Sequence, residues 1–135
     1  MSAVDQAVPI SKGKLWAGRI ISTLVVLFLV FDGVAKLMMI RPVVEAFATL
    51  GYPATVPIPI GILLLVCTLI YVIPQTSVLG AILLTGYLGG ATATHVRASQ
   101  PFYFPIIFGV LVWGGLYLRE SRLHALMPLR SPKTS

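Results

Sequence analysis

Four apolar stretches, joined by short polar connections, take up most of this chain of 135 residues. They cover approximately residues 15–39, 57–73, 78–95 and 102–118. A helix needs about 20 apolar residues to cross a bilayer, so four crossings would use nearly the whole chain. Hydrophobic residues make up 57% of the sequence and charged residues only 10%, which leaves too little polar surface for a soluble domain of this size. The sequence therefore predicts an all-α fold, an integral membrane four-helix bundle surrounded by the lipid bilayer.

The segments outside the four stretches are predicted to be tails and turns. Residues 1–14 are polar and lack a periodic apolar pattern, which predicts a flexible cytoplasmic tail, and residues 119–135 predict a basic cytoplasmic tail. Arg41-Pro42 should break the first helix, and residues 43–50 are expected to form a short helix at the membrane interface. Basic residues precede the first apolar run, as in a secretory signal peptide, but no small-residue cleavage site follows it. We therefore expect an uncleaved first span.

The distribution of lysine and arginine predicts the orientation of the bundle. With four crossings, seven basic residues lie on the side of the two termini and three on the opposite side: Lys12, Lys14, Arg19, Arg119, Arg122, Arg130 and Lys133 against Lys36, Arg41 and Arg97. By the positive-inside rule, both termini are predicted to be cytoplasmic.

Composition also excludes several classes of function. The net charge of +6 comes from basic residues beside apolar segments, which is typical of membrane-topology signals and does not indicate nucleic-acid binding. Cys67 is the only cysteine, so neither an intrachain disulfide nor a Cys-x-x-Cys redox pair can form. No ligand-spacing signature for a metal and no Gly-x-Ser-x-Gly elbow are present. We predict no metal site and assign no catalytic residue.

Polar residues converge on the predicted periplasmic side, where the first and third long helices both end. The pocket candidates there are Asp32, Lys36, Glu45, Tyr52, His95 and Arg97. Asp32 and Lys36 are spaced i, i+4, as in an ion pair on one helix face. Ionisable residues that face the interior of a membrane bundle are functional candidates, and this convergence predicts a ligand pocket. Plainer interpretations stay open: a purely structural ion pair, a histidine that favours the helix dipole, and an arginine that reaches the interface.

Small residues form a strip on the third long helix. Gly86, Gly89, Gly90 and Ala93 include a Gly-x-x-x-Gly step, which lets a neighbouring helix approach to backbone contact in lipid. We expect this strip to be a hub of helix packing.

Several motifs together resemble the DoxX-like family of small bacterial membrane proteins. They are FDGVAKL at residues 31–37, LGYP at 50–53, IPQT at 73–76 and LLTGYLGGATATHVR at 83–97, and the likeness extends over about residues 20–130. The resemblance implies a four-helix, multi-pass protein of the bacterial inner (cell) membrane. The wider group includes proteins associated with a thiosulfate:quinone oxidoreductase, and it resembles quinone-linked thiol oxidoreductases whose paired cysteines this sequence lacks.

Three hypotheses follow, and whether the protein is an enzyme stays open. In the first, Lys36 and His95 hydrogen-bond the carbonyl headgroup of a lipid-like or quinone-like ligand, with Asp32 setting their charge. In the second, the chain is a membrane subunit of a quinone-linked oxidoreductase whose electron donor belongs to a partner. In the third, it is an assembly or chaperone-like partner of another membrane protein, or a homo-oligomer, that binds through the glycine strip or through Gly109, Gly114 and Gly115. Quinone is a candidate cofactor, although the sequence requires none.

Overall fold

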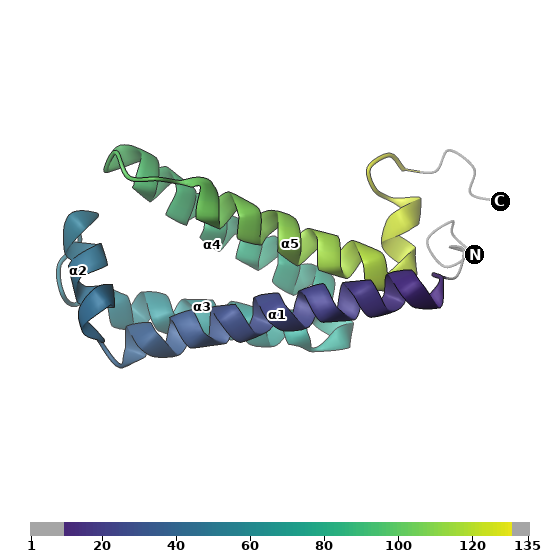
Figure 1. Cartoon of the computed structure of the whole chain (residues 1–135), viewed down its shortest axis with the longest axis horizontal. Helices are drawn as coiled ribbons and strands as arrows, with labels where there is room; N and C mark the ends of the chain where they lie inside the picture. The colour runs from purple at the N-terminus through teal and green to yellow at the C-terminus, as the bar shows by residue number, and fades with distance from the viewer. Residues whose placement is uncertain (1–9, 131–135) are drawn as a thin grey trace.

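The computed structural model describes residues 10–130, which contain five α-helices and no strand (Figure 1). The helices are α1 (Lys12–Leu37), α2 (Arg41–Thr49), α3 (Pro57–Val72), α4 (Ser77–Arg97) and α5 (Tyr103–Arg119), with single 3₁₀ segments at Pro74–Thr76 and Ser121–Ala125. The all-α class is therefore confirmed for this part of the chain. The four long helices follow the four apolar stretches closely, and α2 corresponds to the short helix expected at residues 43–50.

The first helix begins earlier than the sequence predicts. The hydroxyl of Ser11 accepts a hydrogen bond from the backbone N–H of Lys14 at 3.4 Å, which satisfies one of the amides left free at a helix start. Residues 12–14 are thus helical and do not belong to the tail; residues 1–9 lie outside the described part. At the far end of α1 the expected break is found, with Pro42 in the first turn of α2, where its missing N–H costs little.

The predicted basic tail is partly folded onto the helices. Arg119 still belongs to α5, and the 3₁₀ segment that follows carries the buried side chain of Leu123. His124 stacks on Tyr117 with ring centroids 4.2 Å apart. Residues 121–127 therefore pack against α5, while residues 131–135 lie outside the described part.

The four long helices lie side by side, each in contact with two others. Helix α1 packs against α3 and α5, and α4 packs against the same two helices from the other side. Figure 1 shows α1 beginning and α5 ending at the same end of the molecule, here called the termini end. The opposite end carries α2 and the connection between α4 and α5, and is here called the connection end.

Glycines set where the helices come closest. A Cβ on Gly18 of α1 would lie 2.8 Å from the carbonyl oxygen of Gly115 of α5, and a Cβ on Gly80 of α4 would overlap the backbone of Tyr71 of α3. Both contacts lie toward the termini end. Only α1 and α3 stay this close toward the connection end, where a Cβ on Gly61 would lie 2.9 Å from the oxygen of Gly33. The α1–α3 pair and the α4–α5 pair therefore diverge toward the connection end (Figure 1).

The hydrophobic core lies where the four long helices are close together. Its buried members gather in the middle and toward the termini end, and include Val25 and Leu29 of α1, Leu64 of α3, Leu88 of α4 and Val112 of α5. Core packing in the described chain stops about one helical turn before Asp32. The polar residues predicted to form a site therefore lie beyond the closed part of the fold.

The expected packing hub on α4 is not where the helices of this chain meet. A Cβ on Gly86, Gly89 or Gly90 would find no atom within 4 Å in the described structure, and these glycines and Ala93 are exposed. The prediction is wrong for contacts within residues 10–130, because α3 and α5 pack on the other faces of α4. Packing against a helix of another chain stays a prediction.

Two helices, Lys12–Leu37 and the continuous stretch Pro74–Arg97, are long and apolar enough to cross a membrane. Helices α3 and α5 are apolar but shorter. Large apolar side chains cover the outside of all four, for example Leu24, Leu69 and Val110. Soluble monomers rarely expose such extended apolar surfaces, so the surface is of the kind that faces lipid.

Candidate functional site

The predicted ion pair between Asp32 and Lys36 is present, and it is largely shielded from solvent. The Lys36 ammonium donates to the Asp32 carboxylate, and the side chains are 10% and 34% exposed, respectively. Lys36 is buried because its stem lies against Gly61 of α3, whose own Cβ would approach that of Lys36 to 2.9 Å. A glycine at this position of α3 thus makes room for a lysine inside the helix pair.

A tyrosine of the opposite helix pair packs against the same end of the core. Tyr87 of α4, next to Leu88, is half-buried there. The carboxylate and the ammonium lie just beyond the end of the core, and the phenol ring packs against it. Sequence analysis did not select Tyr87, although its position between the glycines of α4 could have drawn attention to it.

Glu45 belongs to a different contact. It accepts a hydrogen bond from Nε of Arg41 at 3.0 Å, and the two side chains are 66% and 89% exposed. The reason is the short helix α2, which presents this i, i+4 pair on its outer surface. No contact in the described structure joins it to Asp32 or Lys36.

Tyr52 and Arg97 take part in a third cluster, here called the polar clamp, together with Leu50 and Thr94. Nη2 of Arg97 donates to the carbonyl oxygen of Leu50 at 2.6 Å, and its guanidinium lies 5.9 Å from the centre of the Tyr52 ring. The Tyr52 hydroxyl is 3.1 Å from Oγ1 of Thr94. The clamp therefore fastens the connection between α2 and α3 to the end of α4, which joins the two helix pairs where they have diverged.

His95 is held by its own helix. Its Nδ1 lies 2.7 Å from the carbonyl oxygen of Ala91, and the ring is half-buried. Among the described residues no contact joins His95 to Asp32 or Lys36. The six predicted residues thus gather at one end, as expected, but in separate contacts, and a pocket shared by all of them stays a prediction.

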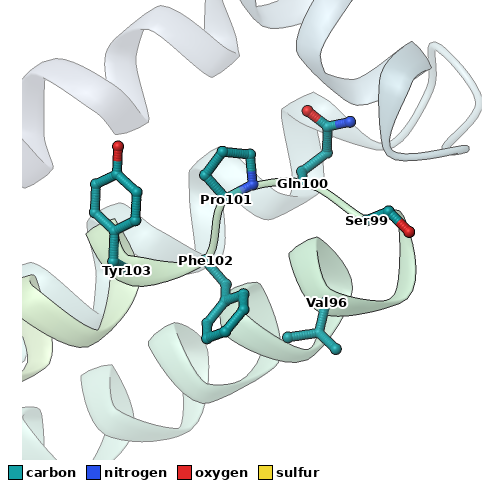
Figure 2. A pocket seen from close by; sticks show the side chains of 6 residues that line it. All are labelled: Val96, Ser99, Gln100, Pro101, Phe102 and Tyr103. Atoms are coloured by element: carbon teal, nitrogen blue, oxygen red, sulfur yellow. The ribbon is translucent and has the colours of Figure 1, made fainter.

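A surface cavity of about 450 Å³ lies at the connection between α4 and α5. Its walls are Val96, Ser99, Gln100, Pro101, Phe102 and Tyr103 (Figure 2). Figure 2 shows the Phe102 ring beside Val96 and the Tyr103 ring directed away from it. None of the six predicted pocket residues contributes to this cavity.

Comparison with known proteins identifies the family of this chain. Residues 20–115, from the first turns of α1 to near the end of α5, match the DoxX-like family. The chain belongs to the DoxX-like family. No curated protein and no solved structure matches it. Family membership and the two helices of spanning length indicate that this DoxX-like protein is a membrane protein.

Another polar cluster of this DoxX-like protein lies at the termini end and was not found from the sequence. Nε of Arg119 donates to Oγ of Ser22 at 2.9 Å, and its guanidinium lies 5.3 Å from the centre of the Tyr71 ring. The Tyr71 hydroxyl donates to the carbonyl oxygen of Val112 at 2.7 Å. The signal in the sequence was a serine and a tyrosine inside otherwise apolar helices, whose polar atoms need partners when they are buried.

Proposed function

We propose that this DoxX-like protein crosses the bacterial inner membrane four times with both termini in the cytoplasm, and that it binds a lipid-like or quinone-like molecule beside Asp32 and Lys36. The apolar outer surface of α1, α3, α4 and α5 supports a membrane bundle, and the excess of basic residues at the termini end supports the orientation. The observation that carries the ligand proposal is the shielded ion pair located where the core stops.

The chemistry of the ion pair suits a neutral headgroup. Lys36 carries three N–H donors, and in residues 10–130 only Asp32 accepts from it. A ligand carbonyl can accept from a remaining donor, while the partly exposed Asp32 carboxylate keeps the local charge balanced. An anionic headgroup would compete with Asp32 for the ammonium, so a quinone or ester carbonyl fits this site better.

The apolar part of such a ligand has a surface to lie on. The core ends at Leu29 of α1 and Leu88 of α4. Beyond it, Phe31 and Val34, close to Asp32 in the sequence, are 69% and 40% exposed, and the two helix pairs diverge from this level outward (Figure 1). An isoprenoid or acyl chain that covers these side chains would bury apolar area at about 25 cal/mol per Å². The geometry therefore favours an amphipathic molecule over a small polar solute.

The test is to count co-purified ligand. The wild type and Asp32→Asn/Lys36→Met would be purified from membranes in mild detergent and examined by native mass spectrometry and solvent extraction for quinones and lipids. Both charges are removed together so that no unpaired ion is left buried. A charge-assisted hydrogen bond contributes roughly 1.5–3 kcal/mol, so ligand retention should fall about 10- to 100-fold.

The matched control is Arg41→Gln/Glu45→Gln, which removes an ion pair of the same spacing from the exposed surface of α2. This variant should retain ligand like the wild type. Equal retention by all three proteins, or a wild type that carries no quinone or lipid at stoichiometric level, would exclude the site.

The exposed glycine strip supports a second candidate function, assembly with another helix. Because nothing in residues 10–130 covers Gly86 or Gly90, the simplest occupant to test is a second copy of this chain. Cysteine crosslinking in membranes at Gly86→Cys, in a Cys67→Ala background, should give dimers, whereas Gly13→Cys on α1 should not. Crosslinks at neither position would argue against self-association through this face.

A further inference from the structure

The cluster at the termini end borders a cavity of about 260 Å³ between α1, α3 and α5. Its polar lining consists of Arg19, Ser22, Thr23, Tyr71 and Arg119, and its apolar lining of Val26, Leu27 and Val72. None of these residues belongs to the Asp32–Lys36 site, which lies more than one helical turn further along α1. The cavity therefore needs an explanation of its own.

The Arg119 side chain is held in place by groups that the fold has already fixed. Tyr71 is fully buried, and its hydroxyl is anchored on the Val112 carbonyl. Gly115 allows α1 so close that Oγ of Ser22 lies within 2.9 Å of Nε of Arg119. With Nε bonded and the planar group lying over the Tyr71 ring, both terminal amino groups have no further partner within residues 10–130.

The charge of this cavity is not neutralised by the described residues. Arg19 lines the same cavity, and its guanidinium lies 5.5 Å from the centre of the Trp16 ring. Neither arginine forms an ion pair within residues 10–130. The nearest carboxylate in sequence, that of Glu120, instead accepts from the backbone N–H of Arg122. Two arginines that have no carboxylate partner within residues 10–130 are an arrangement that can recognise phosphate groups.

We propose that this cavity binds the phosphate of an anionic phospholipid headgroup, with Arg119 and Arg19 as the charged ligands and the Thr23 hydroxyl as an additional donor. The volume is smaller than the roughly 300–1,000 Å³ that enclose a drug-sized ligand, so it suits a headgroup and not a whole lipid. The apolar wall continues from the cavity to Leu27 and Val72, which are exposed on the outer surface of the helices. An acyl chain attached to a bound phosphate can lie along this wall, which a free phosphate ion would leave uncovered.

The experiment measures lipid retention by the full-length protein. The protein would be reconstituted into phosphatidylcholine nanodiscs that contain one-tenth phosphatidylglycerol. It would then be released from the nanodiscs in the mass spectrometer, and the lipids that stay bound to it would be counted. We expect the wild type to retain phosphatidylglycerol about tenfold in excess of its share of the bilayer, as one additional charge-assisted contact would give. Both Arg119→Gln and Arg19→Gln should abolish the enrichment.

Arg122→Gln is the matched control, because it removes one positive charge from the same end without touching the cavity. It should leave the enrichment within about twofold of the wild type, as a remote surface charge contributes little. Arg119→Gln also loses the bond to Ser22, which can weaken the fold. The Arg19 side chain makes no hydrogen bond in the described chain, so Arg19→Gln provides the independent test.

Two outcomes would overturn the proposal. Equal loss of enrichment in Arg122→Gln and Arg19→Gln would show that only the net charge of this end attracts the lipid. Displacement of phosphatidylglycerol by millimolar inorganic phosphate would show that the cavity selects a free anion. Neither outcome bears on ligand binding at Asp32 and Lys36, which is tested with separate variants.

Discussion

Replacing Asp32 by asparagine should destabilise the protein far more than the small change in side-chain size suggests. The substitution keeps the shape of the side chain but removes the only group within residues 10–130 that neutralises the Lys36 ammonium. Lys36 is 8% exposed as a residue, so its charge cannot be fully hydrated in place. Leaving one member of a buried ion pair without its partner costs about 3–5 kcal/mol.

The exposure of Asp32 narrows this range of destabilisation. Asp32 is 34% exposed, so water can reach the site and part of the penalty is relieved. We therefore expect Asp32→Asn to lower the free energy of unfolding by about 3 kcal/mol, at the lower end of the range. Glu45→Gln disrupts a pair whose side chains are 66% and 89% exposed, and such pairs contribute roughly 0–1 kcal/mol.

The assay is reversible unfolding of purified protein in mixed detergent micelles, followed by circular dichroism, for both single variants and for Asp32→Asn/Lys36→Met. The double variant should recover most of the loss, because it removes the uncompensated charge and keeps an apolar stem of similar length against Gly61. The reasoning would be refuted if Asp32→Asn cost no more than Glu45→Gln, or if the double variant were less stable than Asp32→Asn.

Three further predictions concern helix packing, the polar clamp, and the cluster of Arg119, Ser22 and Tyr71. Gly80→Ala places a methyl group on the backbone of Tyr71 and should cost about 1–3 kcal/mol in the same unfolding assay, whereas Gly86→Ala meets no atom and should be neutral or stabilising by up to about 1 kcal/mol; equal effects would contradict the packing described here. Arg97→Gln removes the bond from Arg97 to the Leu50 carbonyl and so weakens the polar clamp; hydrogen exchange should become faster in residues 50–56 and stay unchanged in the core. Tyr71→Phe removes the buried hydrogen bond from the tyrosine hydroxyl to the Val112 carbonyl and should cost about 1 kcal/mol; an unchanged stability would show that this bond contributes nothing.

Helix positions could be predicted from the sequence because they depend on local properties. Long apolar runs, a proline at residue 42 and a tight Pro74–Thr76 connection each act on the chain where they occur. The Asp32–Lys36 pair was predictable for the same reason, since i, i+4 spacing places two side chains on one helix face whatever surrounds them. The start of α1 lies a few residues before the apolar run, because it is set by the Ser11 cap and not by hydrophobicity.

Contacts between helices could not be predicted in the same way, because they depend on which face each helix turns toward its neighbours. The sequence indicates that Gly86 and Gly90 allow close approach, yet in the described chain the close approaches occur at Gly18, Gly80 and Gly115. A glycine pattern shows on which face of a helix a neighbouring helix can come close. The rotation of the helix about its axis decides whether that face is turned toward a neighbour. The bond from Arg119 to Ser22 joins residues 97 positions apart, and no local pattern reports such a pair.

The helices pack closely at the termini end and diverge at the connection end, which explains why the two proposed binding sites should behave differently. At the termini end, glycine contacts and the core hold α1, α3, α4 and α5 together, so Arg119 is fixed before any ligand arrives and can select a headgroup by geometry. At the connection end, the helix pairs diverge and are joined through Arg97 and Leu50, so the region beside Asp32 and Lys36 can adjust to the width of a ligand. Substitutions that loosen the polar clamp should therefore change ligand retention at Asp32 and Lys36 while leaving phospholipid selection at Arg119 intact. A loss of both together would mean that the two ends are not independent.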